Sequence, residues 1–118
     1  MVSGPYQWKV VHAALDPVRG SEQAGDRPVI IVSRESLNRS LTIVGAIPLS
    51  TFRLGRRIYS SEVLIPAGRA GQPNDSIVMA HQLRTIAKER LLRTYGSLDD
   101  DRLREEVRAA IRIYLDLG

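Results

Sequence analysis

The residues best suited to chemistry lie in one polar segment, residues 16–27, between two apolar runs. Its charged members are Asp16, Arg19, Glu22, Asp26 and Arg27. Carboxylates can transfer protons, and guanidinium groups bind anions through several N–H donors. A long polar loop between two stiff strands is also a common place for binding or catalysis. The alternative is a solvated hairpin loop whose charges provide solubility, and spacing alone does not decide between the two.

The apolar runs beside this segment predict two β-strands that would hold the loop. Residues 8–15 predict the first strand, with Trp8 as an anchor at its start. Residues 28–32 predict the second, because four β-branched residues after a proline are typical of a strand buried on both faces. Pro28 is tolerated there, since its missing N–H falls at the edge of the strand.

The rest of the chain predicts three more strands and a final helix. The strands are expected at residues 41–48, 58–65 and 76–80, with a helical turn or compact loop at 34–39, a basic loop at 52–57 and a connecting loop at 66–75. Ser97 is expected to cap the helix, with acidic residues in its first turn, where the helix dipole favours them. One apolar face follows at helical spacing, formed by Leu103, Val107, Ala110, Ile111 and Tyr114. These elements predict an α+β fold in a single domain, residues 1–118.

Composition narrows the classes of function. The 118 residues include no cysteine, so we expect no disulfide and no thiolate zinc site. The two histidines, His12 and His81, lie far apart in sequence, so we expect no dedicated metal site and no cofactor. The N-terminus lacks the features of a signal peptide, and the longest mostly apolar stretch, residues 41–49, is too short to span a bilayer. We therefore expect a cytoplasmic protein without a membrane partner.

The charge distribution indicates a polyanionic partner. The net charge is +4, and residues 1–96 carry +6 while residues 97–118 carry −2. Of the 17 basic residues, all but Lys9 and Lys88 are arginines. Arginine binds phosphates in bidentate fashion and stacks on bases, which suits a nucleic-acid partner. A GC-rich genome would also enrich arginine, so composition alone does not identify that partner.

The segment LDPVRGSEQAGDRPVIIVS, residues 15–33, resembles the signature of the MazF/PemK toxins. These are sequence-specific mRNA interferases of bacterial toxin–antitoxin pairs. The shared elements are a hydrophobic-Asp-Pro step, a Gly-Ser-Glu-Gln loop and an Arg-Pro opening of the second strand. The resemblance continues at residues 48–51 and 82–91 and covers nearly the whole chain. The chain departs from the family at Ser50, where threonine is usual, at Ala87, where aspartate is usual, and at His81, where an acidic residue is common.

The resemblance implies an SH3-like β-barrel with a C-terminal helix, homodimers, and RNA cleavage without a metal. In that reaction the ribose 2′-hydroxyl attacks phosphorus and leaves 2′,3′-cyclic phosphate and 5′-hydroxyl ends. The family motifs assign the catalytic roles to Arg27 and to the hydroxyl of Ser50. Glu22 is either the base or the partner that orients Arg27, and these two roles stay open. Further contacts with RNA are expected from Gln23, Thr51, Arg53, Gln82 and Arg84, while the basic loop could also be a merely solvated surface.

Two other classes of function remain open at this point. A relative with the same fold could poison gyrase without cleaving RNA, although those proteins lack the loop seen here. A plain RNA-binding or regulatory module could have kept the fold and lost the activity, as the changes at Ser50 and Ala87 would allow. In the interferase interpretation, the partners are single-stranded RNA, a second copy of the chain and an acidic, MazE-like antitoxin.

Overall fold

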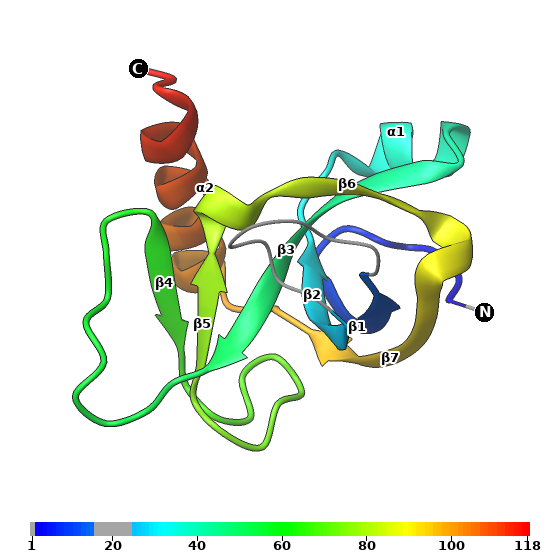
Figure 1. The fold of residues 1–118 in the computed structure, drawn as a ribbon. Helices are drawn as coiled ribbons and strands as arrows, with labels where there is room; N and C mark the ends of the chain where they lie inside the picture. Colours follow the sequence, from blue (N-terminus) through cyan, green and yellow to red (C-terminus); the bar gives the residue numbers. More distant parts are fainter. Residues whose placement is uncertain (1, 16–24) are drawn as a thin grey trace.

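A sheet of seven strands forms the framework of the molecule in a computed structural model that describes residues 2–15 and 25–118 (Figure 1). The strands are β1 (Lys9–Ala14), β2 (Asp26–Ile31), β3 (Ile43–Thr51), β4 (Glu62–Ile65), β5 (Ser76–Met79), β6 (Arg84–Ala87) and β7 (Leu91–Ser97). The helices are α1 (Glu35–Ser40), α2 (Asp101–Leu115) and two single 3₁₀ turns, η1 (Ala80–Gln82) and η2 (Lys88–Arg90). The expected α+β class is confirmed.

Strand β3 is the element on which the sheet is organised. The strands follow the order β4-β5-β3-β2-β1-β7, with β6 on the first half of β3. Every pairing between these described strands is antiparallel. The first half of β3 pairs with β6, its middle with β2 and its last three residues with β5. Its C-terminal end therefore lies beside the start of β2.

Both faces of the central strands are buried, which explains their nearly continuous apolar sequence. Val10 and Ile30 belong to one aliphatic cluster, which includes Leu103 and Val107 of α2. Val11 and Val29, one residue along on each strand, belong to a second cluster on the opposite face. In Figure 1, α2 stands behind β4 and β5, while β6 and β7 curve around β1 and β2. The prediction of a strand buried on both faces at 28–32 is confirmed, although the strand begins earlier, at Asp26.

Several predicted boundaries were wrong. Strand β3 runs on to Thr51 because its end pairs with β5, and β4 begins only at Glu62. The chain also forms β6 and β7, for which no strand was predicted. Much of β7 is exposed, and its pairing with β1 contains two irregularities, so the sequence lacks a clean alternation there.

The C-terminal helix was predicted correctly, and so was its apolar face as far as Ile111, but its start was not. Ser97 ends β7, and Asp100 is the N-cap, since its Oδ1 accepts a hydrogen bond from the Leu103 backbone N–H at 3.0 Å. The buried face consists of Leu103, Val107 and Ala110. Tyr114 at the end of the predicted face is exposed.

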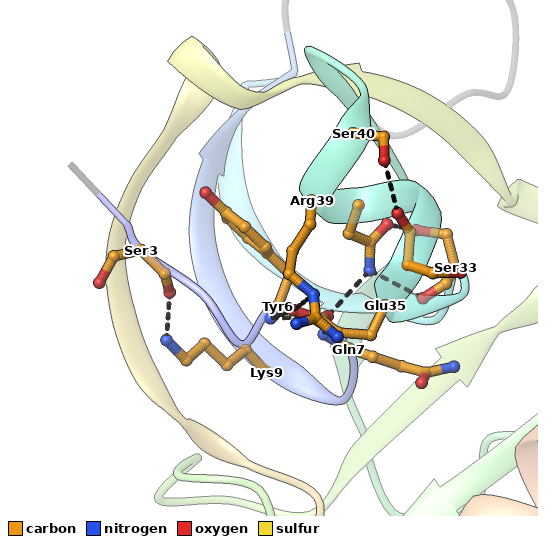
Figure 2. Close-up of polar contacts among 10 residues, drawn as sticks. Ser3, Tyr6, Gln7, Lys9, Ser33, Glu35, Arg39 and Ser40 are labelled. Carbon is orange, nitrogen blue, oxygen red and sulfur yellow. Dashed lines mark hydrogen bonds and ion pairs between the residues drawn. The ribbon is translucent and has the colours of Figure 1, made fainter.

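The segment before β1 is tied to α1 through Glu35 (Figure 2). One carboxylate oxygen accepts hydrogen bonds from the backbone N–H groups of Tyr6 and Gln7 at 2.9 and 2.8 Å. Burial opposes ionisation of Glu35, but these N–H groups and the amide of Asn38 outweigh it, so its pKa lies below the ordinary value. Among the helices of the described residues, none combines the length and the apolar character needed to cross a membrane.

A buried ion pair orders the segment between β3 and β4. The Arg56 guanidinium donates two hydrogen bonds to the Glu62 carboxylate, at 3.0 and 2.8 Å, and the Tyr59 backbone N–H donates a third at 3.0 Å. The Glu62 side chain is only 1% exposed. The Arg56 bond outweighs burial and lowers the pKa of Glu62. The position of the loop that follows β3 therefore depends on this carboxylate.

We expect Glu62→Gln to lower the free energy of unfolding at pH 7 by about 3 kcal/mol, because it leaves a half-buried guanidinium without its counter-charge. Since the pKa of Glu62 is lowered in the folded chain, the stabilisation is present above the ordinary value of 4.5 and is lost as pH falls through the lowered value. Urea unfolding at pH 7 and at successively lower pH measures both effects. Glu106→Gln, which breaks an exposed pair with Arg102, is the control and should cost less than about 1 kcal/mol. Equal losses in the two variants would contradict this account.

Candidate active site

One pocket is lined by candidate residues from the polar segment 16–27 and from the end of β3. It has a volume of about 240 Å³, and we call it the Arg27 pocket. Its lining residues are Asp26, Arg27, Pro28, Leu49, Ser50, Thr51, Gln72 and Ser76. Two of the predicted catalytic residues, Arg27 and Ser50, therefore lie in the same pocket. The third, Glu22, and the predicted RNA contact Gln23 lie outside the described residues.

Strand register explains why Arg27 and Ser50 meet. Val29 of β2 pairs with Pro48 of β3, and the strands are antiparallel. The pairing ends there, and beyond it Arg27 and Ser50 each stand two residues from this last pair, on the same side of it. The guanidinium reaches the end of β3, where its Nη1 donates a hydrogen bond to the Leu49 carbonyl at 3.4 Å. Both side chains are half-buried, so the pocket places a fixed positive charge near a hydroxyl at the protein surface.

Thr51 connects the Arg27 pocket with a second one. This second pocket, of about 620 Å³, is lined by Thr51, Phe52, Arg53, Leu54, Ala67, Pro73, Asn74 and Asp75. We call it the Arg53 pocket. A hydrogen bond of 2.8 Å from the Phe52 backbone N–H to the Asp75 carbonyl holds its two loops together. The two pockets share Thr51, so a ligand of several units could occupy both.

The predicted contacts Gln82 and Arg84 do not line either of these pockets. Gln82 ends η1 and Arg84 opens β6, where it pairs with Ala46 in the first half of β3. Arg84 instead lines a third pocket, of about 310 Å³, together with Arg90. Its Nη1 atom is buried and has no hydrogen-bond partner among the described residues.

The structure adds three polar pocket residues to which the sequence assigned no specific role, namely Asp26, Gln72 and Ser76. Gln72 comes from the segment 66–75, which was interpreted as a plain connection. A single glutamine in a loop rich in glycine and proline carries no pattern by which it could have been found. Asp26 is the neighbour of Arg27 at the start of β2, and this strand brings both residues to the pocket.

Close packing of Gly71 on β7 places Gln72. Gly71 has a φ of +74°, and a Cβ at this position would lie 2.4 Å from the Tyr95 carbonyl oxygen. This contact holds the loop against β7 and directs the next residue toward the Arg27 pocket.

The described residues contain no cluster of metal ligands. Across residues 2–15 and 25–118, no three of His, Cys, Asp or Glu come together as they would for a metal ion.

We expect Gly71→Ala to destabilise the protein by about 3 kcal/mol or more, since it adds a backbone clash to a strained φ. Gly68→Ala is the matched control, because Gly68 has a φ of +82° in the same loop but open space where a Cβ would stand. That variant should lose only about 1 kcal/mol. Thermal unfolding of both variants measures the difference. If the two lose the same stability, the contact with Tyr95 does not hold the loop.

Comparison with known proteins identifies the family of the chain. Residues 6–115 match the family described as the PemK-like, MazF-like toxin of type II toxin–antitoxin systems. The chain is 38% identical over 110 residues to endoribonuclease EndoA of Bacillus subtilis (strain 168), covering 92% of this chain and 91% of the relative. It is 34% identical over 108 residues to endoribonuclease MazF9 of Mycobacterium tuberculosis (strain ATCC 25618 / H37Rv), covering 87% and 89%.

A solved structure confirms the expected fold. The endoribonuclease from Mycobacterial species, solved in complex with its cognate antitoxin, superimposes with a TM-score of 0.79 over 98% of both chains, at 23% identity. The expectation of an SH3-like barrel fold with a C-terminal helix therefore holds, although in the strand order β4 and β7 stand at opposite ends. By its sequence and its fold, the chain belongs to the PemK-like, MazF-like toxins of type II toxin–antitoxin systems.

Proposed function

We propose that this chain is the endoribonuclease toxin of a toxin–antitoxin pair, and that it cleaves single-stranded mRNA at a specific sequence without a metal ion. Family membership and the two relatives named endoribonucleases support RNA cleavage. The observation that carries the mechanism is the position of Arg27, whose guanidinium lies at the end of β3 in one pocket with three hydroxyl-bearing residues. The products are RNA ends with a 2′,3′-cyclic phosphate and a 5′-hydroxyl.

The chemistry follows from these groups. The 2′-oxygen forms a bond to the adjacent phosphorus, and the bond from phosphorus to the 5′-oxygen breaks. Negative charge grows on the phosphate oxygens, and Arg27 can bind two of them while its own charge stays fixed. The Ser50 hydroxyl would donate a further hydrogen bond to the same phosphate. Glu22 would act as the base or as the residue that orients Arg27.

The RNA would extend from the Arg27 pocket into the Arg53 pocket. Arg56 is engaged by Glu62, and the Arg57 guanidinium stacks on the Tyr59 ring at 4.9 Å. Arg53 is exposed and lines the pocket that shares Thr51 with the Arg27 pocket. Of the basic residues in this loop, Arg53 is therefore the one best placed for a backbone phosphate.

Arg84, Gln82 and Gln23 would contact RNA further from the scissile bond. For Arg84, this role is supported by its place in the lining of the third pocket, together with Arg90. The pairing of Arg84 with Ala46 places it three residues along β3 from Leu49, or roughly 10 Å at the spacing of an extended strand. That distance is short enough for one RNA strand to reach both arginines.

We expect Arg27→Ala to fold normally and to lower the single-turnover cleavage rate at least about 100-fold, as loss of a donor to a developing oxyanion does. Arg27→Lys should recover little of the rate, because lysine lacks the bidentate fork. A long RNA is incubated with each protein in EDTA, and cleavage sites are mapped by primer extension. Parental cleavage by Arg27→Ala would refute the role, and an absolute requirement for Mg²⁺ would refute the metal-free reaction. Gyrase inhibition or RNA binding without cleavage would favour the other two functions.

Ser50, not Thr51, should be the assisting hydroxyl. Ser50 is half-buried in the pocket that Arg27 lines, whereas Thr51 is exposed at the junction of the two pockets. We expect Ser50→Ala to lower the single-turnover rate with RNA affinity nearly unchanged. Thr51→Ala should weaken affinity and leave the rate at saturating protein close to parental. Rate measured against protein concentration separates the two, and the reverse pattern would place the hydroxyl at Thr51.

We also propose that the toxin works in the cytoplasm as a homodimer held in check by an acidic antitoxin. The family pairs toxin with antitoxin, and the net charge of +6 over residues 1–96 would attract an acidic peptide as well as RNA. Binding of both should weaken as salt rises. Light scattering measures the mass, and titration with the acidic protein encoded beside the gene measures inhibition. A monomer at micromolar concentration, or a partner that binds without inhibiting, would contradict this proposal.

A further inference from the structure

A chain of hydrogen bonds crosses three strands and ends at the Arg27 pocket. Arg93 of β7 has its Nη2 at 3.3 Å from the Tyr95 hydroxyl, with its guanidinium 4.8 Å from the centre of the same ring. The Tyr95 hydroxyl lies 2.6 Å from Nδ1 of His12 in β1. Nε2 of His12 lies 3.4 Å from Oδ2 of Asp26 in β2. The chain of hydrogen bonds therefore runs from β7 through β1 to the Asp26 carboxylate on β2, which lines the pocket.

The donors and acceptors along this chain have one consistent direction. Arg93 can only donate, so the Tyr95 oxygen accepts from it and the Tyr95 hydroxyl is left to donate to Nδ1 of His12. A neutral imidazole that accepts at Nδ1 carries its proton on Nε2, which donates to Asp26. Packing supports this orientation, because the His12 and Tyr95 rings meet edge to face at 5.8 Å. His12 thus presents a single N–H to the carboxylate.

Within the part of the chain that the structure describes, one oxygen of Asp26 is held and the other is not. Oδ2 faces His12, while Oδ1 accepts no hydrogen bond from residues 2–15 or 25–118. The side chain of Asp26 is 57% exposed, against 21% for His12. It is adjacent in sequence to Arg27 and lines the same pocket. A positioned carboxylate beside the phosphate-binding arginine is what abstraction of a 2′-proton requires.

We propose that Asp26 is the general base of the cleavage reaction and that His12 is its positioning residue, an inference that rests on the proposed function. In the step, the 2′-oxygen bonds to phosphorus as its proton passes to Oδ1 of Asp26. The bond from phosphorus to the 5′-oxygen breaks with its electron pair on oxygen, which takes a proton from water. Asp26 then returns its proton to the solvent. Glu22 is left with the role of orienting Arg27.

Single-turnover cleavage of one RNA by Asp26→Asn tests the base. The substitution keeps the shape, and we expect the rate to fall about 100-fold or more with unchanged melting temperature. Asp99→Asn, an exposed carboxylate beside α2, is the control and should cleave at the parental rate. A substrate with sulfur in place of the scissile 5′-oxygen needs no proton on its leaving group. The Asn variant should stay slow on that substrate, and recovery there would show that Asp26 is an acid and overturn the proposal.

Two variants of His12 test its positioning role. His12→Gln keeps an N–H that can reach Asp26, so it should cleave within about fivefold of the parental rate. His12→Phe keeps a ring against Tyr95 but no donor, so its rate at saturating protein should fall while its RNA affinity stays parental. A parental rate in His12→Phe, or equal losses in the two variants, would overturn the role of His12.

The outcome also separates this inference from the proposed function. The proposed function holds if the parental chain cleaves RNA and Arg27→Ala does not. In that case, only this inference fails if Asp26→Asn cleaves at the parental rate. It also fails alone if Glu22→Gln, and not Asp26→Asn, shows the loss expected of the base. If the parental chain cleaves no RNA, the proposed function fails.

Discussion

The antiparallel pairing of β3 with β2 is the constraint on which the candidate site depends. It brings the start of β2 and the end of β3 together, so that Arg27 reaches the Leu49 carbonyl and shares a pocket with Ser50. A slip of one residue would turn Arg27 to the other face of the sheet, away from this pocket. Burial of β2 and β3 on both faces prevents such a slip, because it would exchange the two aliphatic clusters. The apolar core thus sets the position of a polar site that lies at its edge.

The segments around that pair of strands have distinct tasks. The Glu62 carboxylate holds Arg56 and the loop that carries Arg53, so a buried ion pair away from the Arg27 pocket shapes the neighbouring pocket. Gly71 lets the 66–75 loop approach β7 closely enough to place Gln72. Buried ion pairs are costly to form and are strongly destabilising when broken on one side, which makes them suited to fixing a loop in one position. The site is thereby preorganised by contacts that do not touch a ligand.

Local patterns in the sequence predicted the features of the fold and of the site that depend on residues close together along the chain. The run after Pro28 predicted a buried strand, and the motifs ending in Arg27 and Ser50 predicted two residues that the structure places in one pocket. Other features depend on long-range pairing and left no local pattern. Strand β7 has a single buried residue and is irregularly paired, so neither it nor the contact between His12 and Tyr95, 83 residues apart, could be predicted. Ser97 resembled a helix cap, but the β1–β7 pairing takes it into a strand and leaves capping to Asp100.

The central claim is that the groups around Arg27 cleave RNA through its own 2′-hydroxyl. The most direct measurement uses a short RNA that contains one mapped cleavage site, in EDTA, with a single 2′-deoxy substitution on the 5′ side of the scissile phosphate. The account predicts that this one change abolishes cleavage, that a 2′-deoxy group one nucleotide away does not, and that the unmodified product carries a 2′,3′-cyclic phosphate by mass spectrometry. Cleavage of the substituted RNA at the same bond would contradict the account, since the nucleophile would then be water or a side chain.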